Sequence, residues 1–148
     1  MEERTIRDLD ELDRFAQEIL ARIPKRTEAS VIALSGELGA GKTAFTKSLA
    51  KALGIAEQVL SPTFVLMKSY DVSAGRFRRL VHIDAYRLDN PSEFSALRFG
   101  EIEKDPRTLV AIEWPERLAE NLLNDRMTLT FEQGDDDVRR VRIKPWEL

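Results

Sequence analysis

The sequence predicts an α/β fold with three layers, in which helices flank a mixed β-sheet, and three observations lead to that prediction. A short apolar run, Val31–Leu34, precedes a glycine-rich stretch, Gly36–Thr43. A helical pattern follows from Thr43 to Leu53 and is closed by a glycine. Two further apolar runs, Leu80–Asp84 and Leu109–Glu113, have the length of strands, and each ends in a carboxylate.

The glycine-rich stretch matches the phosphate-loop pattern G-x-x-x-x-G-K-[ST] at every fixed position. Its glycines let successive backbone N–H groups turn toward phosphates, and the helix that follows presents its positive end to them. Lys42 is expected to reach the β- and γ-phosphates, and the Thr43 hydroxyl is expected to bind Mg²⁺. The strand–loop–helix context predicts a P-loop NTPase-like domain. The predicted nucleotide-binding residues of the loop are Gly36, Glu37, Leu38, Gly39, Ala40, Gly41, Lys42 and Thr43.

Length and composition predict one domain over residues 1–148, with a sizeable core. Hydrophobic residues make up 43% and charged residues 33% of the chain, and no apolar run approaches a membrane span. The absence of cysteine excludes disulfides and thiolate metal sites, and we expect a cytoplasmic location. A net charge of −3 argues against a stand-alone nucleic-acid binder.

Other segments are expected to supply the remaining strands of the sheet and the helices that flank it. Thr5–Ile6 is expected to form a short edge strand, and the helix after it is expected to begin at Asp8 or Asp10 and to end at Pro24. Phe64–Tyr70 and Arg79–Asp84 are expected to pair as a hairpin. Helices are expected to begin near Asn90 and at Pro115, and Met127–Lys144 is expected to form a second hairpin.

The two strand-end acids, Asp84 and Glu113, are candidate catalytic residues. In open α/β sheets the carboxyl ends of the strands face the nucleotide. Either acid could hold Mg²⁺, directly or through water, while the other orients the attacking water. The pattern alone does not assign these two roles.

Four further residues lie near the predicted site and have competing interpretations. Thr63 could sense the γ-phosphate or be a plain turn residue, and Arg87 could touch a phosphate or be a surface arginine. The chain's single histidine, His82, is interpreted first as a packing or surface residue. Trp114 is interpreted first as core packing and second as a nucleotide or partner contact. The basic strip of the last strand (Arg139, Arg140, Arg142 and Lys144) is interpreted as a solvated strand face.

Four motifs together resemble the TsaE (YjeE) family of small bacterial ATPases, which are needed to make N6-threonylcarbamoyladenosine on tRNA. They are the phosphate loop, Ser-Pro-Thr-Phe at Ser61–Phe64, His-Ile-Asp-Ala-Tyr-Arg-Leu at His82–Leu88 and Glu-Trp-Pro-Glu at Glu113–Glu116. Their order and spacing are those of the family across nearly the whole chain. The phosphate loop alone would indicate only a superfamily.

The resemblance implies ATP as substrate, Mg²⁺ as cofactor and a role for each matching position. Lys42 binds phosphates, while Thr43 and Glu113 hold Mg²⁺. Asp84 and Thr63 line the hydrolytic site, and Trp114 lies close by. The implied partners are the family's TsaD and TsaB proteins, TsaD performing threonylcarbamoyl transfer, and any contact with tRNA is expected to be indirect.

Two alternatives remain from the residues. A small P-loop kinase would use a phosphoryl-transfer lid built from arginines, although the chain shows no distinct lid insertion. A nucleotide-gated binding module would need ATP but no turnover. ATP is favoured over GTP because no [NT]-K-x-D guanine motif occurs and because of the family resemblance. The candidate lid arginines are Arg76, Arg78, Arg79, Arg87 and Arg98.

Overall fold

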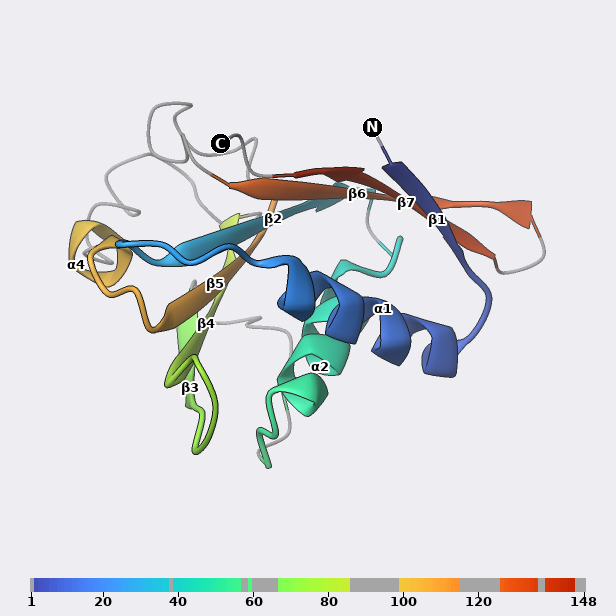
Figure 1. Cartoon of the computed structure of the whole chain (residues 1–148). Helices are drawn as coiled ribbons and strands as arrows, with labels where there is room; N and C mark the ends of the chain where they lie inside the picture. The colour runs from blue at the N-terminus through green and yellow to red at the C-terminus, as the bar shows by residue number, and fades with distance from the viewer. Residues whose placement is uncertain are drawn as a thin grey trace.

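The computed structural model describes residues 2–37, 39–56, 59, 67–85, 99–114, 126–135 and 138–145. Within these ranges one sheet is built from strands in the order β1-β7-β6-β2-β5-β4-β3 (Figure 1). The strands are β1 (Glu2–Ile6), β2 (Ser30–Gly36), β3 (Met67–Asp71), β4 (Arg79–Asp84), β5 (Thr108–Glu113), β6 (Met127–Gln133) and β7 (Arg139–Lys144). The helices are α1 (Leu9–Arg22), α2 (Lys42–Ala52) and α4 (Phe99–Glu103).

The sheet is mixed, as the sequence predicts. Strand β2 pairs in parallel with β5 and β6, and β4 pairs in parallel with β5. The outer pairs β3–β4, β6–β7 and β1–β7 are antiparallel. Strands β4 and β5 are buried on both faces, which explains the apolar run Leu109–Ile112 of β5 and the apolar residues on either side of His82 in β4. Because β2, β4 and β5 run in the same direction, the phosphate loop, Asp84 and Glu113 meet at one edge of the sheet.

Helices α1 and α2 cover one face of the sheet (Figure 1). The Asp8 carboxylate caps α1 by accepting from the Glu11 backbone N–H at 2.8 Å, which selects Asp8 over Asp10 as the start of the helix. Phe45 of α2 packs between Phe15 of α1 and Phe131 of β6, with ring centroids 5.7 Å apart in both pairs. The buried residues of this core include Leu12, Ile19, Ile32, Leu34, Leu49, Leu80, Leu109 and Val141.

A second core lies on the opposite face. Because side chains alternate along a strand, Val31, Val81 and Val110 point away from α1 and α2 and pack with Ile102 of α4. The described helices therefore lie on both faces, which gives the three layers expected of the fold. Strand β3 begins at Met67; the first half of its expected span, and the helices expected near Asn90 and at Pro115, lie outside the described residues.

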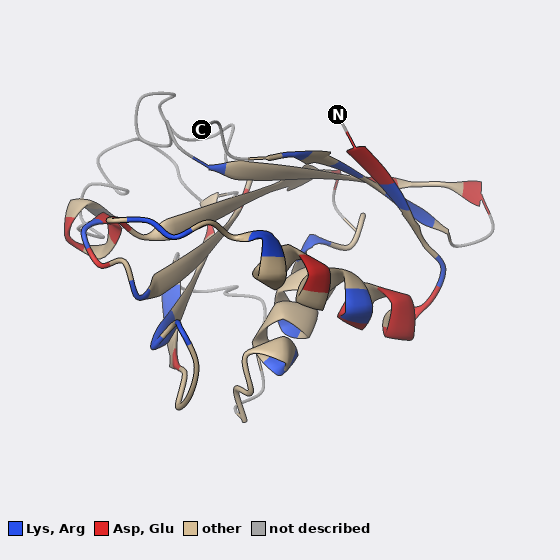
Figure 2. Ribbon diagram, viewed as in Figure 1, with Lys and Arg blue, Asp and Glu red and all other residues tan. Residues whose placement is uncertain are grey.

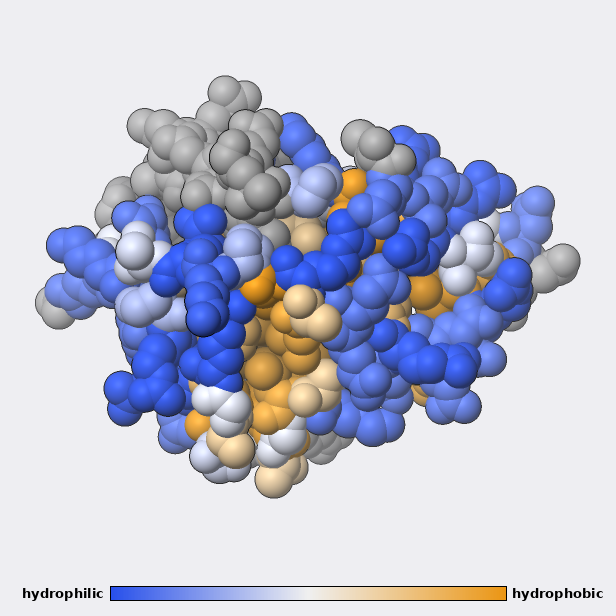
Figure 3. Space-filling view, viewed as in Figure 1, coloured by the Kyte–Doolittle hydropathy of each residue, from blue (hydrophilic) through white to orange (hydrophobic). Residues whose placement is uncertain are grey.

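Charged and apolar residues are distributed unevenly over the viewed face of the molecule. Figure 2 shows acidic and basic residues alternating along α1, whereas α2 presents lysines. Figure 3 shows apolar residues gathered between the two helices and strands β4 and β5, with hydrophilic residues around them. No helix in the described ranges is long and apolar enough to cross a membrane.

Candidate nucleotide site

The loop between β2 and α2 has the backbone of a phosphate cradle. Three glycines adopt positive φ angles: Gly36 at 137°, Gly39 at 81° and Gly41 at 115°. Gly41 is also the N-cap residue of α2, and no side chain caps this helix. A helix that follows such a glycine loop directs its first N–H groups toward the loop, where anionic ligands bind.

Gly36 can be tested directly, because its position leaves no room for a side chain. A Cβ atom there would lie 2.4 Å from the Phe131 carbonyl oxygen, at a φ that other residues rarely adopt. We expect Gly36→Ala to lower the free energy of unfolding in urea by at least about 2 kcal/mol. Gly39→Ala is the matched control: its Cβ would meet nothing within 4 Å, and its positive φ alone costs about 1 kcal/mol. Equal losses in the two variants would contradict the close approach of Gly36 to β6.

Lys42 lies inside the loop, with only 4% of its surface exposed. Its ammonium donates to the Gly36 carbonyl oxygen at 2.5 Å and lies 3.4 Å from the centroid of the Trp114 ring. Both contacts are of kinds that a buried ammonium group commonly makes. A phosphate bound in the loop would compete with them for Lys42.

Thr43 and the two strand-end acids meet beside Lys42. The Thr43 hydroxyl donates to the Glu113 carboxylate, at 3.1 Å from Oε1 and 3.2 Å from Oε2. Asp84 is the register partner of Glu113 on the neighbouring strand, and the two acids are 9% and 4% exposed. The parallel pairing of β4 and β5 thus brings together the two carboxylates expected from the sequence.

A magnesium ion would find suitable donors here. Hydroxyl and carboxylate oxygens are ligands that Mg²⁺ accepts, and this cation commonly takes one or two protein oxygens together with substrate phosphates and water. In the described part of the chain, no group of three or more acidic, histidine or cysteine side chains is arranged to hold a metal ion. The Thr43 hydroxyl and the Glu113 carboxylate are oxygen donors of the kind that such a Mg²⁺ ion takes.

Trp114 leaves strand β5 with an unusual backbone. Its φ is 60°, and among the described residues it is the one that combines a side chain with a positive φ. The Trp114 backbone N–H donates to the Leu34 carbonyl oxygen at 3.2 Å, and its half-buried ring packs against the second core while facing Lys42. The packing interpretation of this tryptophan thus holds in part, and a nucleotide or partner contact stays a prediction. Strained backbone of this kind concentrates at functional sites.

His82 makes a contact that the sequence analysis missed. It is fully buried, and its Nε2 lies 2.5 Å from Glu113 Oε2. The only signal in the sequence was the alternation of β4, which places His82 on the same face as Asp84. Recognising the contact also required the register between β4 and β5.

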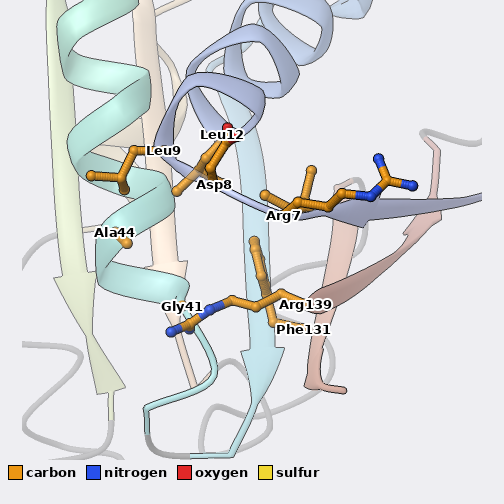
Figure 4. A pocket seen from close by; sticks show the side chains of 9 residues that line it. Arg7, Asp8, Leu9, Leu12, Gly41, Ala44, Phe131 and Arg139 are labelled. Atoms are coloured by element: carbon orange, nitrogen blue, oxygen red, sulfur yellow. The ribbon is translucent and has the colours of Figure 1, made fainter. Parts of the chain in front are cut away.

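Arg139 corrects the prediction that the basic strip is a solvated strand face. Arg140, Arg142 and Lys144 are exposed as expected, but Arg139 Nη1 donates to the Gly39 carbonyl oxygen at 3.0 Å. Figure 4 shows its side chain extending from β7 to Gly41 at the start of α2. There it borders a pocket of about 200 Å³. The pocket is otherwise lined by Ile6, Arg7, Asp8, Leu9, Leu12, Ala44 and Phe131.

A family model described as "Threonylcarbamoyl adenosine biosynthesis protein TsaE" matches residues 6–141. This chain belongs to the TsaE family. A Streptomyces coelicolor protein with the name "tRNA threonylcarbamoyladenosine biosynthesis protein TsaE" is 38% identical over 86% of this chain and 88% of its own length. A Nostoc protein of the same name is 41% identical over 81% and 73% of the two chains. The crystal structure of YdiB from Bacillus subtilis superposes with a TM-score of 0.65 at 25% identity, covering 95% of this chain and 82% of that one. These matches confirm the expected family and the P-loop NTPase-like fold.

Not every site residue expected of a TsaE chain can be placed. Leu38, Thr63 and Arg87 lie outside the described residues, so their expected roles stay predictions. Glu37 and Gly39 are exposed on the loop, and Ala40 is buried beneath it. The site residues that can be placed lie together where the parallel strands end. They are the loop, Lys42, Thr43, Asp84, Glu113 and Trp114.

Of the arginines considered for a kinase lid, Arg76 and Arg79 make contacts away from the phosphate loop, while Arg87 and Arg98 lie outside the described residues. Arg76 donates to the Ile23 and Pro24 carbonyl oxygens, at the end of α1. Arg79 begins β4, at the strand end opposite Asp84, and donates to Thr108 at 3.2 Å. Arg76 thus binds the segment that follows α1, and Arg79 joins β4 to β5. Neither arginine contacts the phosphate loop through these bonds, and the kinase alternative stays a prediction.

Proposed function

We propose that this chain is a Mg²⁺-dependent ATPase that serves the formation of N6-threonylcarbamoyladenosine on tRNA. The observation that carries the proposal is the convergence of Lys42, Thr43 and Glu113 at the uncapped N-terminus of α2. A loop of this kind favours a polyphosphate, and the hydroxyl–carboxylate pair favours the cation that accompanies one. The family's name supplies the pathway.

Each residue of the site has a task in hydrolysis. Lys42 exchanges its contacts with Gly36 and Trp114 for the β- and γ-phosphates, and the N–H groups of the loop bind the remaining phosphate oxygens. Thr43 and Glu113 would hold Mg²⁺, which when bound neutralises charge on the phosphates. Asp84, beside Glu113, orients the attacking water. Water attacks the γ-phosphorus, the bond to the β–γ bridging oxygen breaks, and ADP, phosphate and a proton are released.

The pocket beside Arg139 is where we place the base and ribose of the nucleotide. It opens next to Gly41 and Ala44, at the start of the helix that receives the phosphates. Leu9, the one strongly exposed large apolar side chain of the described residues, is 71% exposed at its rim and offers a surface for a flat ring. A bound base would cover this apolar surface, and the Arg139 guanidinium could stack on the base or pair with a phosphate.

Turnover is expected to depend on partners. The described site supplies Lys42, Thr43 and two carboxylates, but none of its described residues neutralises the γ-phosphate from the side away from the loop. A partner of the TsaD–TsaB type in the cytoplasm would cover the site and complete it. In related P-loop enzymes a group supplied in this way changes the rate by roughly 10³–10⁵-fold.

The proposal is tested by steady-state phosphate release from the chain alone and with saturating TsaD and TsaB proteins. We expect slow release alone and a large acceleration in the mixture. The same mixture with Lys42→Ala is the control, since it measures phosphate released by any other component. Equal rates for the chain alone and for the mixture, with docking confirmed separately, would contradict partner-dependent turnover.

A further inference from the structure

We propose that His82 is a positioning residue for the Glu113 carboxylate, fixing which of its two oxygens is offered to Mg²⁺. This inference rests on the proposed function, because it assigns a role toward the proposed metal ion. The observation behind it is the 2.5 Å contact between His82 Nε2 and Glu113 Oε2, in which both side chains are buried. Neither the phosphate loop nor the metal ligands require a histidine at this place.

The sheet brings His82 to Glu113 through a diagonal contact. Leu80 lies two residues before His82 on β4, so the two side chains share a face of the sheet. Leu80 belongs to the core beneath α1 and α2, and so does Ala111 of β5. His82 is the register partner of Ala111, while Glu113 lies two residues further along β5. Diagonal neighbours of this kind are within reach of a long side chain. The small Ala111 leaves the imidazole room to lean toward Glu113.

The chemistry of the contact fixes the direction of the hydrogen bond. A carboxylate that holds a metal ion is ionised and only accepts hydrogen bonds, so the role proposed for Glu113 requires Nε2 of His82 to donate. The other ring nitrogen, Nδ1, is buried and has no hydrogen-bond partner among the described residues. The bond to Glu113 is therefore the polar contact that orients the ring within the described structure.

This bond makes the two oxygens of Glu113 unequal. Oε2 accepts from His82, and both oxygens lie within 3.2 Å of the Thr43 hydroxyl. If the Thr43 oxygen held a cation, Oε1 would be the carboxylate oxygen left without another partner among these three residues. His82 would thus favour Oε1 as the oxygen that Glu113 offers to the metal ion. Groups that hydrogen-bond to metal ligands in this way typically contribute 10–100-fold to metal affinity.

A packing role would be met by any side chain of similar size, and two variants of equal length separate the two roles. His82→Gln keeps an N–H donor at nearly the position of Nε2, whereas His82→Met fills the same space without a donor. The experiment measures the Mg²⁺ concentration that gives half-maximal binding of a non-hydrolysable ATP analogue. Thermal unfolding of each variant is recorded alongside, and binding of the analogue is also measured in chelator.

We expect His82→Gln to stay within about threefold of wild type and His82→Met to need roughly 10–100-fold more Mg²⁺. In chelator the three proteins should bind the analogue equally. A folded His82→Met protein with the wild-type Mg²⁺ midpoint would overturn the positioning role while leaving the proposed function intact. A wild-type protein whose analogue binding does not respond to Mg²⁺ would overturn both.

A second measurement needs neither metal nor nucleotide. His82 is the only histidine in the chain, so its imidazole nitrogens give one unambiguous set of NMR signals. We expect Nε2 to be protonated in the free protein, with a proton signal that shifts in Glu113→Ala. An Nε2 without a proton could not donate to Glu113 and would overturn the inference.

Discussion

Lys42→Ala should weaken ATP binding by at least about 100-fold. A charge-assisted hydrogen bond contributes about 1.5–3 kcal/mol, and Lys42 is placed to make more than one with the β- and γ-phosphates. Each 1.4 kcal/mol corresponds to a factor of ten in affinity. Calorimetric titration of ATP in the presence of Mg²⁺ measures the loss.

The matched control for this variant is Lys47→Ala. Lys47 lies on the same helix and is exposed, and its replacement by alanine removes the same charge. It should bind ATP within about twofold of wild type, because exposed charges contribute little at physiological salt. Wild-type affinity in folded Lys42→Ala would show that the phosphates bind elsewhere.

The second large effect separates the two acids. Glu113→Gln keeps the shape of the side chain but removes the charge that a metal ion needs, so Mg²⁺ should no longer strengthen ATP binding. Asp84→Asn should bind Mg²⁺ and ATP nearly as wild type does and lose turnover, by roughly 10²–10⁴-fold if Asp84 handles the attacking water. Nucleotide titrations with Mg²⁺ and in chelator, together with phosphate release in the presence of partners, read out both properties.

Asp84 and Glu113 have similar environments, so each of the two variants is a control for the other. They are register partners on β4 and β5 and are similarly buried, so general damage to the sheet should affect both variants alike. Opposite phenotypes, with Asp84→Asn losing the Mg²⁺ effect and Glu113→Gln keeping it, would mean that the two roles are exchanged.

The phosphate loop and the two acid-ended strands could be predicted because their signals are local. A strand, a glycine loop and a helix follow one another over residues 30–52, and the family motifs fix the order of the rest. Which strands lie next to each other was not a local signal. Asp84 and Glu113 are register partners because β4 and β5 are parallel neighbours. The hairpin of β6 and β7 was predicted, but the pairing of β1 with β7 has no signature in the composition of these strands.

The residues that sequence reasoning misjudged depend on this long-range order. Arg139 reaches Gly39 because the hairpin returns the start of β7 beside the end of β6, where the loop lies. His82 reaches Glu113 because its register partner is a small residue. A periodic pattern shows which face a side chain takes, but not which strand supplies its neighbour.

We propose that the phosphate loop, together with Glu113, binds ATP and Mg²⁺ through Lys42 and Thr43. Calorimetric titration of ATP into the full chain, once with Mg²⁺ and once in chelator, tests it most directly. We expect one ATP per chain, with binding clearly tighter when Mg²⁺ is present. Absence of binding, or equal affinity in the two conditions, would contradict it.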